Sequence, residues 1–370
     1  MRLTRRGFLS QSSSLLGAGM LAEAVEAAPA AKGPHDYIIV EGHRDIWELA
    51  DRFESRDRSQ HSPIRDFLAP RLIEAGVDVV VMPAGGESLE ERAGSEKMFE
   101  GSMRVLDMFL VEIEKISGKA SIIKTKTDLP TTPNRGKVQF FLDLEGGGSI
   151  QIDPEPGYHP DRRLALLRQF FRLGVRGMQL THHARNMLAD GFWEGKIAGN
   201  LSGFGVEVVQ EMNRLGMMVG VSHLSATGVI HACKVSKHPI VSTHQNIQPF
   251  LKTPLELIED EVKAIASTGG VMGMRYIKGQ AEYRLMADEI EHLAKTVGVQ
   301  HVAVGWLGHD SGCGCNKCRL PNQTGVETQT MNEHWSAFIK LLAERGFTEQ
   351  QIGLILGGNF LRVWKEILPA

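Results

Sequence analysis

The chain has 370 residues, of which 42% are hydrophobic and 23% are charged, and its formal net charge is -3 at pH 7. This is an ordinary globular composition, and the lack of any long basic block in the sequence argues against a nucleic-acid partner. Beyond the first thirty residues the sequence has no run of eighteen apolar residues, so we expect no membrane span.

The first thirty residues differ in composition from the rest of the chain. The pair Arg5-Arg6 precedes a mild apolar stretch at 15–21, and Ala-rich sequence follows. This order is typical of an export signal, and the adjacent arginines resemble the twin-arginine type. We expect residues 1–30 to be this signal and residues 31–370 to be a single domain that is periplasmic or secreted. An N-terminal amphipathic helix is the alternative interpretation.

Eight short apolar runs recur along the rest of the chain, and stretches with helical periodicity separate them. The runs lie at 37–40, 77–82, 138–142, 174–180, 217–221, 240–242, 270–274 and 301–305. The helical stretches include 161–173, 205–215, 260–267 and 287–297. Apolar strands that alternate with helices indicate a parallel sheet buried on both faces, and eight of them predict an α/β fold, the (β/α)8 TIM barrel. A doubly wound open sheet is the alternative, but no Gly-x-Gly-x-x-Gly motif follows the first run.

Polar side chains follow most of these runs, at the points where the predicted strands end. They are His43 and Asp45 after the first run, Glu145 after the third, His182 and His183 after the fourth, His223 after the fifth, His244 after the sixth, and His309 and Asp310 after the eighth. The active site of such a barrel lies at the carboxyl-terminal ends of its strands. Imidazole and carboxylate groups are ligands that suit Zn, Mn or Fe. The pattern therefore predicts a metal site at this end of the barrel.

The spacing of the polar residues suggests how they share two metal ions. His43 and Asp45 are two residues apart, so both side chains can point to the same side of an extended strand and bind one ion. Glu145 can bridge to a second ion, which His223 and His244 complete. Two ions would hold a hydroxide at neutral pH and polarise a carbonyl. Each residue alone has an ordinary structural interpretation, such as a helix cap for Glu145, and only their joint placement favours a metal centre.

A resemblance to a known family covers nearly all of the mature chain. It is carried by segments 41–45, 144–146, 174–190, 200–205, 211–217, 221–225, 235–240 with His244, 298–302 and 357–363. In these segments the sequence resembles the membrane (renal-type) dipeptidase family, peptidase family M19, of the amidohydrolase-like superfamily. The resemblance implies a binuclear zinc barrel that hydrolyses the amide bond of dipeptides through a metal-bridging hydroxide.

The resemblance also implies roles for individual residues. One Zn2+ would be bound by His43, Asp45 and Glu145, and the other by Glu145, His223 and His244. His182 would lie near the substrate carbonyl and stabilise the oxyanion. The neighbouring His183 is expected to pack or to form a hydrogen bond.

Two segments depart from the pattern of the family. Its eighth strand normally ends in Gly-Ser-Asp-Phe-Asp-Gly, whereas residues 305–312 read Gly-Trp-Leu-Gly-His-Asp-Ser-Gly. Asp310 is the nearest carboxylate and is the expected catalytic proton shuttle, with His309 as the alternative. The family also presents an Arg to the dipeptide carboxylate after the sixth strand. Residues 246–257 contain no Arg, and their one cation, Lys252, cannot replace its bidentate contact.

Three of the four cysteines follow the altered end of the eighth strand, at Cys313, Cys315 and Cys318. In an exported protein this spacing favours a local disulfide or a simple loop. A small metal site or a redox role is the alternative, although no fourth metal ligand is evident.

The sequence thus favours a zinc-dependent dipeptidase in which Glu145 and Asp310 are catalytic. The alternatives are an amidohydrolase of this type that acts on another substrate, including an ester or a lactone, and a non-catalytic metal-binding barrel. The shifted Asp310 and the missing Arg motivate the last of these. A small peptide or amide is the expected partner. The sequence leaves open whether the protein forms a homodimer.

Overall fold

The computed structural model describes most of the chain after its first 31 residues. The described ranges are 32–44, 62–87, 98–151, 164–251, 255–276, 283–306 and 331–370. Residues Met1–Ala31 form a unit separate from Lys32–Ala370. Several predicted features lie outside the described residues: the export signal, Asp45, Lys252, His309, Asp310, Cys313, Cys315 and Cys318.

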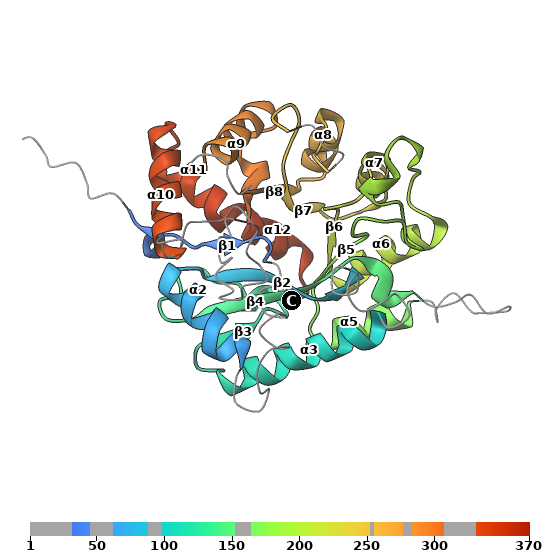
Figure 1. Cartoon of the computed structure of the whole chain (residues 1–370), viewed down its shortest axis with the longest axis horizontal. Coiled ribbons are helices and arrows are strands. Elements are labelled where there is room, and N and C mark those ends of the chain that lie inside the picture. The colour runs from blue at the N-terminus through green and yellow to red at the C-terminus, as the bar shows by residue number, and fades with distance from the viewer. Residues whose placement is uncertain are drawn as a thin grey trace, which may run out of the picture. The chain divides into compact units, whose positions relative to one another are not determined.

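Eight parallel strands of the described chain form a barrel in the spatial order β1-β2-β4-β5-β6-β7-β8-β9 (Figure 1). Their bounds are β1 Val40–Glu41, β2 Val79–Gly86, β4 Val138–Glu145, β5 Gly177–Gln179, β6 Met218–Gly220, β7 Val241–Gln245, β8 Val271–Arg275 and β9 Val302–Trp306. Two backbone hydrogen bonds close the barrel. Gly42 N–H donates to Val304 O at 3.2 Å, and His43 N–H donates to Gly305 O at 2.8 Å. The predicted (β/α)8 barrel is therefore confirmed, and the open sheet is excluded.

Helices surround the strands on the outside of the barrel, except α12, which packs against the residues inside it (Figure 1). Their bounds are α2 Ala69–Ala75, α3 Met98–Lys115, α5 Ala165–Arg172, α6 Gly203–Leu215, α7 Ala226–Val235, α8 Glu259–Ser267, α9 Arg284–Thr296, α10 Met331–Glu344, α11 Glu349–Gly353 and α12 Asn359–Ile367. The four helical stretches predicted from periodicity correspond to α5, α6, α8 and α9. Side-chain capping explains where some helices begin, as Ser202 Oγ accepts the Gly205 N–H at the start of α6. None of the described helices combines the length and the apolar character that a membrane span needs.

One strand is not predicted by the sequence. β3, Ala120–Ile122, pairs in parallel with the first residues of β4, so that Ala120 lies opposite Val138. It has only three residues, and a segment this short cannot be distinguished from a loop by its periodicity. The first predicted strand also differs from its prediction at 37–40, because β1 begins at Val40 and continues to Glu41.

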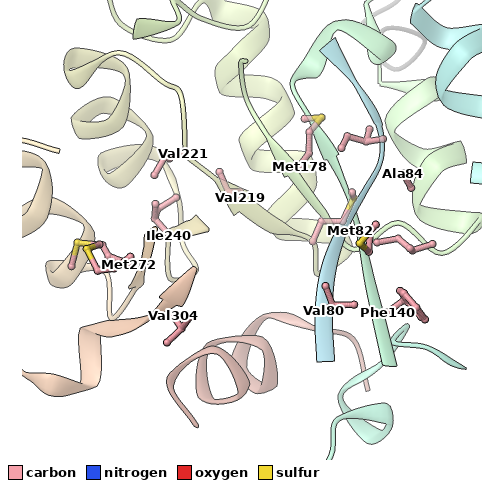
Figure 2. Packing of buried hydrophobic residues seen from close by; sticks show 14 of the residues in the cluster. Val80, Met82, Ala84, Phe140, Met178, Val219, Val221, Ile240, Met272 and Val304 are labelled. Carbon is pink, nitrogen blue, oxygen red and sulfur yellow. The ribbon is translucent and has the colours of Figure 1, made fainter. Parts of the chain in front are cut away.

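Successive residues of each strand alternate between the helical layer and the barrel interior. Val80 and Met82 belong to the larger apolar cluster, which includes residues from the surrounding helices (Figure 2). Val79 and Val81 belong to a second cluster inside the barrel, together with residues of α12. Both faces of β2 are therefore buried, which is why its sequence is a continuous apolar run.

The inner face of β4 changes from apolar to polar along the strand, from Phe141 through Asp143 to Glu145. At its apolar end, Phe141 stacks on Trp364 of α12 with ring centroids 4.4 Å apart. The Trp364 indole N–H also faces Met218 Sδ at 3.3 Å. This apolar plug closes the amino-terminal end of the barrel and leaves the carboxyl-terminal end for the polar residues.

Trp364→Ala tests the plug. Removal of the buried indole leaves a cavity beside Phe141, so we expect the free energy of unfolding to fall by about 3–5 kcal/mol. Val111→Ala, at an exposed position of α3, is the control and should change it by less than about 0.5 kcal/mol. Urea denaturation measures both variants. Equal effects of the two substitutions would contradict the plug.

Glu261 predicts a pH dependence of stability that does not involve the polar end of the barrel. Burial raises the pKa of Glu261 to about 7, although its carboxylate accepts the Ile258 N–H at 2.8 Å. The folded state therefore favours the protonated acid, and its ionisation opposes folding. Compared with Glu261→Gln, the wild type should lose stability as the pH rises from about 4.5 to about 7. Urea midpoints measured across this range check the sign, and a constant difference would contradict it.

Candidate metal centre

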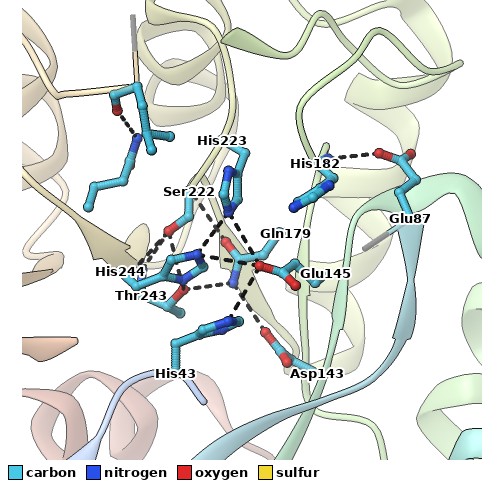
Figure 3. A network of polar contacts seen from close by, with 12 residues as sticks. His43, Glu87, Asp143, Glu145, Gln179, His182, Ser222, His223, Thr243 and His244 are labelled. Carbon is cyan, nitrogen blue, oxygen red and sulfur yellow. Dashed lines mark hydrogen bonds and ion pairs between the residues drawn. The ribbon is translucent and has the colours of Figure 1, made fainter. Parts of the chain in front are cut away.

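Four polar side chains meet at the carboxyl-terminal end of the barrel (Figure 3). Glu145 ends β4, His43 follows β1, His223 follows β6 and His244 lies in β7. The Nε2 atoms of His43, His223 and His244 lie 3.5, 3.3 and 3.4 Å from Glu145 Oε1. All four side chains are buried. The structure therefore brings together four of the five predicted ligands, while Asp45 lies outside the described residues.

The separations of these atoms fit a metal ion. Ligand atoms lie about 2.0–2.2 Å from a bound Zn2+, so ligands around one tetrahedral ion are about 3.3–3.5 Å apart. The distances to Glu145 Oε1 fall in this range, whereas His223 Nε2 and His244 Nε2 are 2.8 Å apart, at hydrogen-bonding distance of each other. Within the described ranges, two candidate groups have ligand atoms within 4.8 Å of one another: His43 with Glu145 and His244, and His182 with His183 and His223.

The protonation states of the cluster also suit a cation. Burial by itself would raise the pKa of Glu145, but His43, His223 and His244 lower it well below its ordinary value. Burial lowers the pKa of His244 well below its ordinary value, and His43 adds to this effect. An ionised carboxylate therefore lies beside an imidazole, that of His244, which resists protonation. Metal binding requires these same states of both groups.

His223 occupies a strained backbone conformation. Its φ is 67°, in the left-handed region that non-glycine residues rarely adopt. Backbone hydrogen bonds hold this turn, because Phe192 N–H donates to His223 O at 2.9 Å and Leu224 N–H donates to Val221 O at 3.2 Å. Such strain persists only where surrounding contacts enforce it, and it is often found at functional sites. The imidazole of His223 is thus held toward Glu145 by a turn that the neighbouring segments fix.

A layer of hydrogen-bonding side chains lies beneath the imidazoles (Figure 3). Gln179 Nε2 donates to Asp143 Oδ2 and to Thr243 Oγ1, each at 3.2 Å. Thr243 Oγ1 in turn lies 2.9 Å from His244 Nδ1. When His244 Nδ1 carries the proton and donates to Thr243, its Nε2 keeps a lone pair for a cation. Gly220 makes room for this layer, because a Cβ there would lie 2.2 Å from Gln179 Oε1.

His182 lies beside the centre, with its ring centroid 4.6 Å from that of His223. Burial lowers the pKa of His182 to about 3, so its imidazole is neutral at physiological pH. Its backbone N–H donates to Glu87 Oε2 at 2.7 Å, and Glu87 Oε1 accepts the Asn186 Nδ2–H at 2.6 Å. His183 stacks on His182 with ring centroids 3.6 Å apart.

Glu87 is the residue of this site that the sequence reasoning missed. The sequence predicts that the second strand ends at Met82, and no carboxylate or imidazole follows directly at that point. β2 instead continues to Gly86, and Glu87 follows it directly. The sequence does contain a carboxylate directly after Pro83-Ala84-Gly85-Gly86. The proline and glycines of that segment are typical of a turn, so the sequence does not indicate that the strand continues to it.

The model of one family, Membrane dipeptidase (Peptidase family M19), matches residues 34–369. The chain belongs to this family. The match covers all of the described residues that form the barrel, and it confirms the resemblance noted in the sequence.

Two individual relatives have low sequence identity to this chain. Dipeptidase verJ of Clonostachys rogersoniana is 28% identical over 276 residues, which cover 72% of this chain and 65% of that protein. Dipeptidase 3 of Mus musculus is 30% identical over 245 residues, which cover 63% of this chain and 45% of that protein. The matched region thus spans about half to two thirds of the length of these relatives.

Solved structures share the fold over a larger fraction of the chain. A structure described as the dipeptidase AC, a metallopeptidase of family M19, has a TM-score of 0.72 at 18% identity and covers 90% of this chain and 100% of that one. A metallopeptidase from Rhodobacter sphaeroides, liganded with a phosphinate mimic of the dipeptide L-Ala-D-Ala, has a TM-score of 0.71 at 17% identity with the same coverage. At this level of identity the similarity shows a common fold.

Thr243→Val tests the layer beneath the imidazoles. The substitution removes the hydroxyl that lies 2.9 Å from His244 Nδ1, so we expect metal affinity to fall about 10–100-fold, whereas Thr243→Ser should retain it. Thr268→Val is the matched control, because Thr268 Oγ1 accepts the Ile240 N–H at the opposite end of β7. Competition with a chelator measures the affinity. Comparable losses in Thr243→Val and Thr268→Val would show a general effect of folding instead.

Proposed function

We propose that this member of the M19 family is a dipeptidase that uses two divalent ions, of which zinc is the metal that the family resemblance implies. The observation that carries the proposal is the convergence of three imidazole Nε2 atoms on Glu145 Oε1 at the carboxyl-terminal end of the barrel. His43, Glu145, His223 and His244 would hold the ions, with Asp45 as the fifth predicted ligand. Divalent ions at such a site lower the pKa of water and polarise a carbonyl.

The residues around the ligands supply binding and orientation. His182 is neutral because burial lowers its pKa to about 3, so its ring can donate an N–H to the carbonyl oxygen of the substrate without bringing in a charge. Glu87 fixes the backbone at His182, and the strained turn at His223 holds the next imidazole. Asp310, or His309 in its place, remains the predicted group that transfers the proton to the leaving amine.

The substrate is proposed to be a small peptide with one amide bond to cleave. The structural neighbour from Rhodobacter sphaeroides was solved with a phosphinate mimic of L-Ala-D-Ala, which supports dipeptides with a D-residue at the carboxyl-terminal side as test substrates. The Arg5-Arg6 pair supports the further proposal that the protein is exported to the periplasm by the twin-arginine route.

Metal removal and Glu145→Gln test the proposal together. Wild-type protein loaded with Zn2+ should hydrolyse dipeptides, lose this activity after chelation and regain it when Zn2+ is restored. Glu145→Gln should lower kcat/KM by more than about 100-fold, because it removes the charge of the central ligand. Glu259→Gln, a fully exposed carboxylate of α8, is the matched control and should leave kcat/KM unchanged.

Two results would contradict the proposed dipeptidase activity. A zinc-loaded protein that hydrolyses no dipeptide, amide or ester would be a non-catalytic metal-binding barrel. A protein that cleaves esters or lactones but no dipeptide would share the metal chemistry and differ in substrate. Assays of product release for each substrate class, followed at one metal concentration, separate these outcomes.

A further inference from the structure

Two large hydrophobic side chains are exposed in one short segment beside the metal centre. The segment is the 3-10 helix η7, Phe192–Ile197, and its exposed members are Trp193, at 62%, and Ile197, at 78%. In the described part of the chain the other exposed large hydrophobic residues are Phe99, at 42%, and Val111, at 40%, and both lie on α3. An exposed indole forgoes the free energy of burial, so its position needs an explanation.

Backbone hydrogen bonds fix this segment to the centre. Phe192 N–H donates to the carbonyl of His223 at 2.9 Å, and Trp193 N–H donates to the carbonyl of His183 at 3.1 Å. Gly191 also forms an antiparallel bridge with Leu224. The first residues of η7 are therefore attached to the same strained turn that presents His223. The position of Trp193 relative to the metal ligands is set by the backbone.

A series of rings leads from Trp193 to the centre. The ring centroids of Trp193 and His183 are 4.8 Å apart, and those of His183 and His182 are 3.6 Å apart in a stacked arrangement. The centroid of His183 is also 5.1 Å from that of His223. Consecutive Cα atoms are about 3.8 Å apart. A side chain of a dipeptide whose amide lies at His182 and His223 can therefore reach the indole.

The charges next to Trp193 are neutralised within the segment. Arg185 forms an ion pair with Asp190 and lies 3.4 Å from Glu194, the residue after Trp193. Lys196 adds a second positive charge, so the formal charges of residues 185–197 sum to zero and the neighbourhood of the indole has little net charge to attract a cation. An apolar group gains more from contact with such a surface than a charged group does.

We propose that His183 and Trp193 form a platform for an apolar side chain of the substrate. The platform makes dipeptides with a large aliphatic or aromatic residue the preferred class. This inference rests on the proposed dipeptidase activity and assigns a specificity to it. Trp193 thereby acts in substrate selection, and Ile197, which ends the same segment, is the control position.

Dipeptides that differ in one side chain test the platform. Two series, X-Ala and Ala-X with X as Leu, Phe, Ala or Asp, are assayed with wild type, Trp193→Ala, Trp193→Phe and Ile197→Ala. In one of the two series, Trp193→Ala should lower kcat/KM for Leu and Phe about tenfold, mainly through KM, and leave Ala-Ala within about twofold. Trp193→Phe should restore most of the preference, and Ile197→Ala should behave as the wild type.

Three results would overturn the platform. They are an equal loss on all dipeptides, no loss with Trp193→Ala, and a change of oligomeric state in light scattering without a change of selectivity. The last would make Trp193 part of an interface between copies. A wild type that cleaves no dipeptide would instead remove the proposed function itself, and with it this assignment. The platform is wrong, and the proposed function still holds, if the wild type is active and replacement of Trp193 does not change its selectivity.

Discussion

A buried carboxylate among buried imidazoles is the constraint on which the rest of this structure depends. Glu145 Oε1 lies within 3.5 Å of three imidazole nitrogens. The low pKa of Glu145 keeps the carboxylate ionised, and the low pKa of His244 keeps that imidazole neutral. It is unfavourable to bury a carboxylate oxygen and imidazole lone pairs close together unless a cation compensates their negative charge and partial charges. The proposed affinity for metal thus depends on how the barrel desolvates and assembles these side chains.

The barrel keeps this arrangement in place by separating an apolar end from a polar end. β4 shows the division within one strand, since Phe141 packs on α12 while Glu145, four residues later, lies at the centre. Hydrogen bonds then hold the layer below the candidate ligands. Gln179 donates to Asp143, and Ser222 Oγ accepts the backbone N–H groups of Thr243 and His244. The functional groups consequently stand on rigid strand ends, and the strained turn at His223 is supported on both sides.

Much of this organisation could be predicted from the sequence. The alternation of apolar runs and helical periods predicts the barrel, and the polar residues that follow the runs predict four of the ligands that the structure brings together. Two kinds of feature could not be predicted. The three-residue β3 has too little length for a periodicity, and Glu87 follows a strand that continues through a proline and two glycines. Its contact with the His182 loop depends on two segments that are 95 residues apart.

The role of His183 is not decided by the sequence, and the side chains close to it in the fold indicate one. A histidine next to His182 has an ordinary packing interpretation, and only the fold shows it stacked on His182 and facing Trp193. The division of the ligand atoms into two groups, one around Glu145 and one that includes His182 and His183, likewise depends on the turn at His223. Such features arise where strand ends meet, and local patterns do not encode them.

The central claim is that the ions bind where the imidazoles converge on Glu145. The most direct test is a crystal structure of the zinc-loaded protein with anomalous data collected at the zinc absorption edge. We expect anomalous peaks about 2.0–2.2 Å from ligand atoms of Glu145, of His43 and of at least one of His223 and His244. Zinc peaks confined to other parts of the molecule, with Glu145 still bonded only to imidazoles, would contradict it.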